Sequence, residues 1–261
     1  MKIFFIGDIF GKAGRVILAG ELEKLKKIYN WDICIANAEN SAGGKGITYD
    51  VAREILNYGV DALTLGNHAW ARKEILDCID SCDCLIRPAN FPGGVPGKGR
   101  LVIDKNGIRL GVLNLVGRVY MEQPAECPFL TADREISILK QQCSAILVDF
   151  HAEATSEKAA LAYYLDGKVS AVVGTHTHVQ TADERILNNG TAFITDVGMT
   201  GPSEGIIGVE RSQIINKFVT GLPARFKPAS GRGCLNAVLI KVDDSSGKAT
   251  GIERIAGIYE L

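Results

Sequence analysis

The chain opens with the segment Lys2-Ile3-Phe4-Phe5-Ile6-Gly7-Asp8, an apolar run of four residues that ends in a glycine and a carboxylate. A short continuous apolar run bounded by turn signals is typical of a strand buried on both faces. Farther along, Leu18, Leu22 and Leu25 stand at i, i+4 and i+7, the spacing of an amphipathic helix. The opening segment therefore predicts a buried strand that leads into a helix, the first part of a right-handed βαβ unit.

The same alternation continues through the first half of the chain. Asp32–Ala36 and Ala62–Leu65 are further apolar runs, and Thr48 is a candidate N-cap for the helix between them. Another helix is expected around Ile75 and Ile79, which stand at i and i+4. Strands that alternate with helices predict a parallel sheet covered by helices.

The second half adds strands that mostly form pairs. An Asn-Gly turn at Asn106-Gly107 predicts a hairpin, and a helix around Ala159–Leu165 separates two later apolar runs. No repeat, low-complexity tract or long linker divides the chain, so we expect one α/β domain over residues 1–261. The strands expected in this half are Arg100–Asp104, Ile108–Val116, Ala145–Phe150, Val169–Val173, Glu184–Leu187, Ala192–Ile194, Ala237–Val242 and Gly251–Ile258.

Composition and charge exclude several classes of protein. Apolar residues make up 46% of the 261 residues and charged residues 23%, as in an average soluble globular protein. The formal net charge of −1 argues against a global attraction to DNA or to an anionic membrane. We see no signal peptide and no apolar stretch of membrane-spanning length, so we expect a cytoplasmic protein that does not bind membranes.

The seven cysteines indicate neither a disulfide framework nor a zinc ribbon, because their number is odd and no Cys-x-x-Cys pair occurs. Cys78, Cys82 and Cys84 form a cluster that would suit a metal in principle. Free cysteine is among the most buried residue types, so we interpret the three as small apolar residues that pack a helix end and the strand after it.

All four histidines of the chain lie just past the ends of predicted strands. Ligand sites in α/β proteins gather outside the carboxyl ends of strands, because the loops converge there. The first three strands also end in carboxylates, amides or an imidazole, which are metal-binding groups. The strand ends together bring eight such residues to one edge: Asp8, Glu39, Asn40, Asn67, His68, His151, His176 and His178.

Each of these residues has a purely structural interpretation when it is taken alone. Asp8 suits a turn or a helix cap, and Asn67 with His68 suits a turn. His151 alone would be a hydrogen-bonded core or surface histidine. Thr175-His176-Thr177-His178 is more specific, because in an extended segment residues i and i+2 point the same way and both imidazoles would face one cation or two neighbouring ones. The joint use of every histidine favours a metal site.

The chemistry of the ligands narrows the choice of metal. Carboxylates, amide oxygens and imidazoles without a thiolate suit Mn, Fe, Co, Ni or Zn rather than a cysteine-held structural zinc. Without His68 the set contains seven candidate ligands, which are too many for one ion that keeps open positions. Two ions about 3.5–4 Å apart that share a carboxylate would use all seven. With only Asp8 and Glu39 as anionic ligands, the site would attract a hydroxide and a phosphate. We expect two divalent or transition-metal ions, with Fe and Mn favoured over Zn, Ni or Co.

Four motifs, in chain order, resemble the signatures of the calcineurin-like metallophosphoesterases: Gly7-Asp8, Gly66-Asn67-His68, His151 and Gly174-Thr175-His176-Thr177-His178. Longer stretches are similar to the bacterial YmdB-type branch, described as 2′,3′-cyclic-nucleotide phosphodiesterases: residues 38–44, 149–155 and 195–202. The resemblance covers essentially the whole chain. It implies a four-layered α/β/β/α metallophosphoesterase sandwich with mixed sheets, and hydrolysis of a phosphodiester.

The chain departs from the general superfamily at two metal motifs. The usual Asp-x-His start is Asp8-Ile9-Phe10 here, so one histidine ligand is missing, and Ala38-Glu39-Asn40 replaces the second aspartate motif. The resemblance to the YmdB-type branch implies that Glu39 bridges the two ions and that Asn40 fills the vacant place. It then implies these two ligand sets: Asp8, Glu39, Asn40 and His178 for one ion, and Glu39, Asn67, His151 and His176 for the other.

One basic stretch lies outside these motifs. Arg225, Lys227 and Arg232 fall in a Gly/Pro-rich segment near the C-terminal end of the chain. This segment either reaches over the site toward a phosphate or forms a plain surface loop, and the surface loop is the simpler interpretation.

We therefore expect a metal-dependent phosphodiesterase that hydrolyses a 2′,3′-cyclic nucleotide or a related RNA end. A hydroxide that bridges the two ions would attack phosphorus in line, while both ions stabilise the charge that develops on the phosphoryl oxygens. His68 follows a ligand without being assigned to a metal, which makes it the candidate general acid.

Two alternatives stay open. A phosphomonoesterase would be distinguished by comparing a diester with the corresponding monoester. A metal-holding regulator that binds RNA or a nucleotide without turnover is disfavoured, because His68 is not needed to bind metal; full metal occupancy with no hydrolysis of any diester would favour it. The sequence leaves open whether the chain forms a homo-oligomer.

Overall fold

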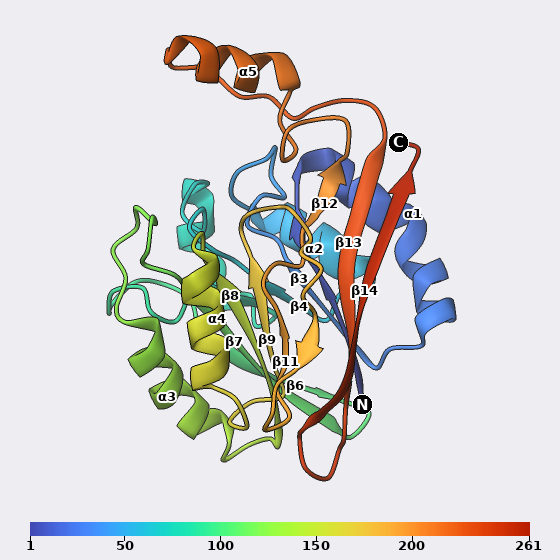
Figure 1. Ribbon diagram of the computed structural model, residues 1–261, viewed down its shortest axis with the longest axis vertical. Coiled ribbons are helices and arrows are strands. Elements are labelled where there is room, and N and C mark those ends of the chain that lie inside the picture. The colour runs from blue at the N-terminus through green and yellow to red at the C-terminus, as the bar shows by residue number, and fades with distance from the viewer.

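The computed structural model describes residues 1–261, and its first sheet is built around the strand that opens the chain. The sheet has eight strands (Figure 1): β1 (Lys2–Ile6), β2 (Asp8–Ile9), β3 (Ile33–Asn37), β4 (Ala62–Thr64), β5 (Leu85–Ile86), β12 (Met199–Pro202), β13 (Gly233–Val242) and β14 (Ala249–Tyr259). β1, β3, β4 and β5 pair in parallel, as the strand–helix alternation predicted. β13 pairs antiparallel with both β1 and β14, so the sheet is mixed.

The second sheet has six strands: β6 (Arg100–Lys105), β7 (Ile108–Val116), β8 (Ala145–His151), β9 (Ala171–Thr175), β10 (Arg185–Ile186) and β11 (Ala192–Ile194). Its centre is parallel, because β7 pairs in parallel with β8, β8 with β9, and β9 with β11. β6 and β10 pair antiparallel at the two edges. All six overlap predicted strands, including the hairpin of β6 and β7.

The side chains of β1 show how the layers pack. Ile3 and Phe5 lie in the core between the two sheets, whereas Phe4 and Ile6 lie in a core shared with helices α1 (Gly11–Tyr29) and α2 (Tyr49–Asn57). A third core joins the second sheet to α3 (Pro128–Leu139) and α4 (Thr155–Tyr164). Figure 1 shows these helix pairs on opposite outer faces. The molecule is therefore the four-layered α/β/β/α sandwich that the resemblance implied.

The structure corrects the helix expected around Ile75 and Ile79. Two short 3-10 helices, Lys73–Asp77 and Ile79–Ser81, stand there instead. Both isoleucines are buried, so their spacing identified core positions correctly. Cys78 between them has a φ of −130°, which is not helical, and its thiol donates a hydrogen bond to the Glu74 carbonyl. Apolar spacing alone does not distinguish one α-helix from two short turns.

The cysteine interpretation holds in part. All seven cysteines are free, and Cys78 and Cys82 pack partly buried against the core beneath α1 and α2. Cys84 is exposed, so the interpretation as a packing residue is wrong for that position. None of the helices is both long and apolar enough to cross a lipid bilayer.

The segment between β12 and β13 contains a helix that was not predicted, and only its basic stretch from Arg225 to Arg232 was interpreted from the sequence. We call residues 203–229 the arm. It carries helix α5 (Arg211–Thr220), which stands away from the two sheets in Figure 1. Only Ile214 of this helix is buried, whereas Phe218 and Val219 are about four-fifths exposed, at 79% and 80%. The two ends of the arm lie close to the site described next.

Candidate active site

All eight predicted site residues lie together at one edge of the sandwich, where the carboxyl ends of the parallel strands of both sheets meet. Five of them line a cavity of about 640 Å³, and the other three lie beside these: Asp8 is near His178, His151 contacts Glu39, and Asn67 contacts His151. Asp8 lies in β2 just after β1, His151 is the last residue of β8, and the others lie in loops that follow strands: Glu39 and Asn40 after β3, Asn67 and His68 after β4, His176 and His178 after β9.

Glu39 lies at the centre of this cluster and is fully buried. Its Oε1 is 3.2 Å from Nε2 of His151 and accepts a 3.1 Å hydrogen bond from the Asn40 side chain. Burial raises the pKa of the Glu39 carboxyl, but His151 and His68 outweigh burial and hold it well below its usual range. Burial lowers the pKa of His151, and Glu39 with Asp8 raises it overall to about 9. Glu39 is therefore a buried negative charge between two groups of ligands.

The first group contains Asp8, Asn40 and His178. Nε2 of His178 is 3.8 Å from Oδ1 of Asp8 and 3.2 Å from Nδ2 of Asn40. The Asp8 carboxyl is fully buried, and burial raises its pKa. Its Oδ2 accepts the backbone N–H of His176, but its Oδ1 has no hydrogen-bond partner. A buried carboxylate oxygen without a partner is costly, and a cation is the partner that would satisfy it.

The second group contains Asn67, His151 and His176. Nε2 of His151 is 2.9 Å from Oδ1 of Asn67 and 3.0 Å from Nδ1 of His176. Ligand atoms of Glu39, His151 and His176 all lie within 4.8 Å of one another. Burial and the nearby His151 lower the pKa of His176 to about 3, so this imidazole is neutral near pH 7.

The residues present fit a dimetal centre. Their donor atoms are oxygen and nitrogen, the unpartnered oxygen of Asp8 lies beside His178, and Glu39 contacts both ligand groups. This donor set suits first-row divalent ions and excludes a cysteine-held zinc site. The division of ligands between two ions stays a prediction.

His68 differs from the other histidines in its contacts. Its Nδ1 lies 2.9 Å from Oδ1 of Asn40 and 3.0 Å from Oε1 of Glu39. Both oxygens accept hydrogen bonds, so Nδ1 carries a proton and Nε2 is the ring nitrogen left for a substrate atom. The side chain lines the cavity and is 26% exposed. The ring can therefore offer Nε2 to a molecule bound in the cavity.

Sequence reasoning missed the residues that orient His151. The Thr175 hydroxyl donates to Oδ1 of Asp149 at 2.7 Å, so it accepts from Nδ1 of His151 at 2.9 Å. This chain of hydrogen bonds turns Nε2 of His151 toward Glu39 and Asn67, and a hydrogen bond to the far ring nitrogen commonly orients metal-bound imidazoles in this way. The available signal was a carboxylate, Asp149, two residues before His151 in an otherwise apolar strand.

The expectation of an extended segment around His176 and His178 was wrong. β9 ends at Thr175, and the two histidines have φ angles of 104° and 67°, in the left-handed region that few side chains adopt. The backbone N–H and hydroxyl of Thr177 donate to Oδ2 of Asp196, at 3.0 and 2.9 Å. Asp196 in turn pairs with the fully buried Lys158 at 2.7 Å. Both imidazoles reach the cluster, but through a turn held by this buried ion pair.

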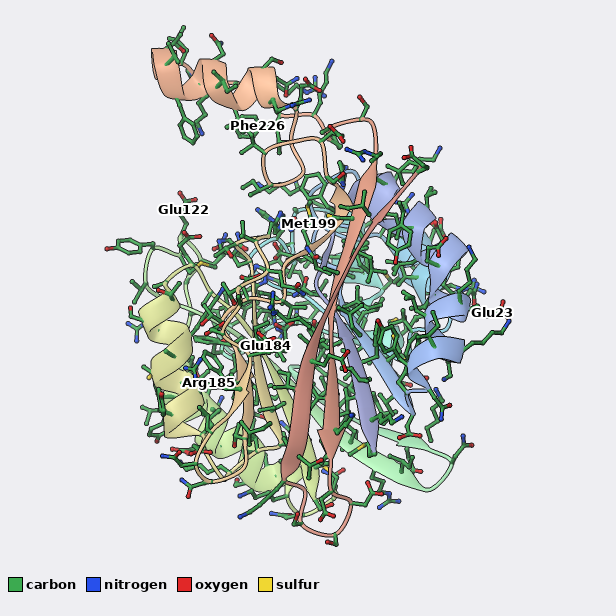
Figure 2. All side chains as sticks on the ribbon, turned by 45° about the vertical axis from the view of Figure 1, so that its right-hand side comes forward. Glu23, Glu122, Glu184, Arg185, Met199 and Phe226 are labelled. Atoms are coloured by element: carbon green, nitrogen blue, oxygen red, sulfur yellow. The ribbon has the colours of Figure 1, made fainter.

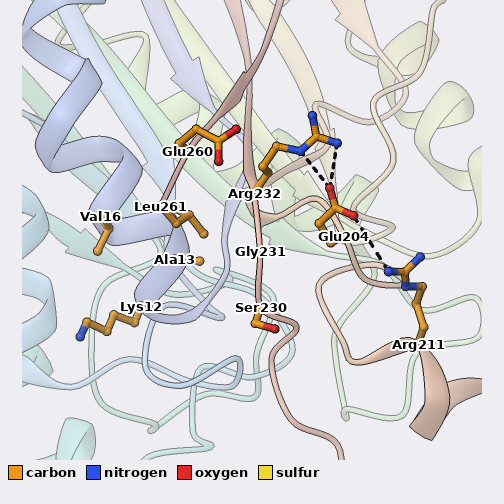
Figure 3. Close-up of a pocket in the computed structure, with 10 residues that line it drawn as sticks. All are labelled: Lys12, Ala13, Val16, Glu204, Arg211, Ser230, Gly231, Arg232, Glu260 and Leu261. Carbon is orange, nitrogen blue, oxygen red and sulfur yellow. Dashed lines mark hydrogen bonds and ion pairs between the residues drawn. The ribbon is translucent and has the colours of Figure 1, made fainter.

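The three basic residues predicted near the C-terminal end lie in different surroundings. Arg232 lies in a separate hollow of about 830 Å³, where its guanidinium pairs with Glu204 at 2.9 Å (Figure 3). Arg211 lies 4.0 Å from the same carboxylate, and none of the predicted ligands lines this hollow. Arg225 is exposed and lines neither hollow, as a plain surface loop would have it. Lys227 does line the cavity of the ligand cluster.

Comparisons with known proteins identify the family of this chain. The chain matches the family described as YmdB-like protein over residues 4–255. A 2′,3′-cyclic-nucleotide 2′-phosphodiesterase of Bacillus subtilis is 52% identical over 255 residues, which are 98% of this chain and 96% of that relative. A putative phosphatase/phosphodiesterase of Mycoplasma genitalium is 38% identical over 261 residues, with 98% and 92% of the two chains covered.

Two solved structures are also similar. A hypothetical protein from Thermus thermophilus has a TM-score of 0.93 at 39% identity, covering 99% of this chain and 100% of that one. A phosphatase from Mycoplasma pneumoniae has a TM-score of 0.93 at 38% identity, covering 100% and 94%. The family match and these relatives extend over nearly the full length of the chain, so it belongs to the YmdB-like family of the calcineurin-like metallophosphoesterases, as its motifs had indicated.

Proposed function

We propose that this chain, acting as one domain, is a metal-dependent phosphodiesterase that hydrolyses 2′,3′-cyclic nucleotides or closely related phosphodiesters. The observation that carries the proposal is His68, whose Nδ1 is held by Glu39 and Asn40 while its Nε2 is left for the cavity. A site that only stores metal needs no such group. The name of the Bacillus subtilis relative supports the same reaction class.

The ligand cluster would hold two ions, one on Asp8, Glu39, Asn40 and His178, the other on Glu39, Asn67, His151 and His176. Bound there, divalent ions lower the pKa of water and stabilise negative charge on phosphoryl oxygens. The oxygen and nitrogen donors favour Fe or Mn over softer metals.

The chain's own residues supply positioning and a proton. In its charged form His68 carries a proton on Nε2 as well as on Nδ1, and Nδ1 lies 3.0 Å from the carboxylate of Glu39. From Nε2 the proton passes to the ribose oxygen that leaves phosphorus, while Nδ1 keeps its bond to Asn40 or Glu39. Lys45 and Lys227 line the same cavity, and their positive charge attracts an anionic substrate.

The test is turnover by metal-stripped protein before and after addition of Mn, Fe or Zn. We expect hydrolysis of a 2′,3′-cyclic nucleotide only with metal, and at least ten times faster than release of phosphate from the corresponding 2′- or 3′-monoester. Faster release from the monoesters would identify a phosphomonoesterase. Full metal occupancy without hydrolysis of any diester would identify a regulator instead.

A further inference from the structure

The cavity of the ligand cluster continues past the cluster to an apolar wall. Ile207, Val209 and Phe226, all from the arm, form most of this wall. Phe226 is 43% exposed and Ile207 49% exposed, so apolar surface stands open beside the catalytic groups. Apolar surface inside a ligand cavity marks a place for an apolar or aromatic part of the ligand.

The part of the wall near Ile207 is rigidly built. Ile206 and Val209 exchange backbone hydrogen bonds of 2.8 and 3.0 Å across a tight turn. Ile207 has a φ of 46° and Gly208 one of 91°, and a left-handed β-branched residue persists only where its surroundings hold it. The Ile207 carbonyl accepts from Nδ1 of His178 at 3.1 Å. The apolar wall is therefore hydrogen-bonded to His178, a predicted metal ligand.

Phe226 is held on the returning end of the arm, below α5 (Figure 2). The backbone of Glu210 donates to the Lys227 carbonyl at 3.0 Å, and the backbone of Lys227 donates to the Gln213 side chain at 2.8 Å. Nζ of Lys217, from α5, lies 5.1 Å from the centre of the Phe226 ring. The lysine contacts the ring from the helix, and the ring borders the cavity.

We propose that Ile207, Val209 and Phe226 form the subsite for the nucleobase of the substrate. This inference rests on the proposed function and adds to it the part of the substrate that the arm contacts. In a 2′,3′-cyclic nucleotide the ribose separates the base from the cyclic phosphate. With the phosphate at the ligand cluster, the base must therefore lie against another wall of the same cavity. Stacking on an aromatic ring tolerates any base, so this subsite selects for the presence of a base rather than for its identity.

The test compares two cyclic phosphates that differ only in the base. Kinetic constants are measured on 2′,3′-cyclic AMP and on ribose 2′,3′-cyclic phosphate, with wild-type protein and with Phe226→Ala. We expect the variant to lose roughly 5- to 100-fold in kcat/KM on 2′,3′-cyclic AMP, chiefly through KM, and to change little on the abasic compound. Phe226→Tyr should retain the preference of the wild type for the base. Phe218→Ala is the matched control, because Phe218 is on the same arm but does not line the cavity.

The outcomes separate this inference from the proposed function. Hydrolysis of neither compound by metal-loaded wild type would overturn the function itself. Equal kcat/KM values of the wild type on both compounds, or equal losses on both in Phe226→Ala, would overturn the base subsite and leave the function standing. A change of mass in solution in Phe226→Ala, with the preference for the base intact, would mean that the ring contacts a second copy of the chain, and it would also overturn the subsite.

Discussion

Nδ1 of His178 lies 3.1 Å from the carbonyl oxygen of Ile207. Because a carbonyl only accepts, Nδ1 carries the proton and Nε2 turns its lone pair toward Asp8 and Asn40. A hydrogen bond of this kind sets the tautomer of a metal-binding imidazole and its orientation. The arm therefore supports the proposed metal site as well as the apolar wall of the cavity.

This link predicts that Gly208→Ala weakens metal binding at His178. A Cβ on Gly208 would lie 2.9 Å from Met199 and from the Phe10 ring, at a φ of 91°, so either the turn that carries Ile207 or these two side chains, of which Phe10 packs against His178, must move. We expect roughly 10- to 100-fold weaker binding of one ion per chain, the usual effect of losing an outer partner of a ligand. Titration of stripped protein with Mn measures it.

The control for that variant is Gly221→Ala. Gly221 is on the same arm and also has a positive φ, of 70°, but a Cβ there meets nothing within 4 Å. The Gly221→Ala variant has the same kind of backbone strain but no steric clash, so its metal affinity should match that of the wild type. Equal weakening in both variants would mean that strain in the arm, rather than the contact to His178, affects the site.

A second prediction concerns the shared carboxylate. Glu39→Gln should lose more metal than Asn40→Ala, because the first change removes a buried charge that contacts both ligand groups and the second a neutral donor beside His178. Metal content per chain, measured after dialysis against a weak chelator, compares the two. Thermal unfolding checks that both variants are folded. Similar losses would argue against Glu39 as the bridging ligand.

The strand ends were predictable because they depend on local pattern. Apolar runs placed β1, β3 and β8. Parallel pairing of β1 with β3 then brings Asp8 and Glu39 to one edge, and packing of the second sheet on the first adds His151 from β8. The resemblance to a known family added the roles of these residues.

The turn at His176 and the arm were not predictable in this way. The left-handed backbone of His176 and His178 is held by Asp196 and Lys158, which come from other elements of the second half of the chain. α5 does carry a helical pattern, because Ile214, Ile215, Phe218 and Val219 stand at i, i+1, i+4 and i+5, but only Ile214 of these is buried, so the apolar face covers no core. Where tertiary contacts decide the backbone, a single sequence carries no local signal.

The buried ion pair of Lys158 and Asp196 gives a stability prediction. Lys158→Met leaves a fully buried carboxylate without its cation, so we expect a loss of about 3–5 kcal/mol in the free energy of unfolding. Lys98→Met is the control, because Lys98 pairs with Asp83 at a surface where the side chains are 58% and 85% exposed, and it should change stability far less. Urea unfolding of both variants measures the difference. A comparable effect in the two would mean that the buried pair adds nothing beyond a surface pair.

Asp183 gives a pH prediction. Burial raises the pKa of its carboxyl, but hydrogen bonds from Thr195, Thr181 and Arg185 outweigh burial and lower it overall. A lowered pKa stabilises the fold above the pKa of the unfolded chain, about 3.9, and this contribution fades as the pH falls through the folded pKa. Asp183→Asn should therefore be less stable than wild type at pH 7, with the gap narrowing below about pH 4. Asp77→Asn, at an exposed position, is the control. A gap in midpoint of unfolding that stays constant from pH 7 to pH 3 would contradict this reasoning.

The last prediction tests the proton that His68 supplies. His68→Ala removes a residue outside both ligand groups, so the variant should still bind both metals. A ribose oxygen leaves phosphorus poorly without a proton, whereas p-nitrophenolate leaves readily. We therefore expect a loss of about 10²–10⁴-fold in turnover of a 2′,3′-cyclic nucleotide, the usual contribution of a positioned acid, and a visibly smaller loss with a p-nitrophenyl diester. Metal content is measured first, and kinetics on the two substrates follow on the same preparation. Equal losses would show that His68 stabilises transition-state charge or positions the substrate, because only proton donation depends on how badly the leaving oxygen needs a proton.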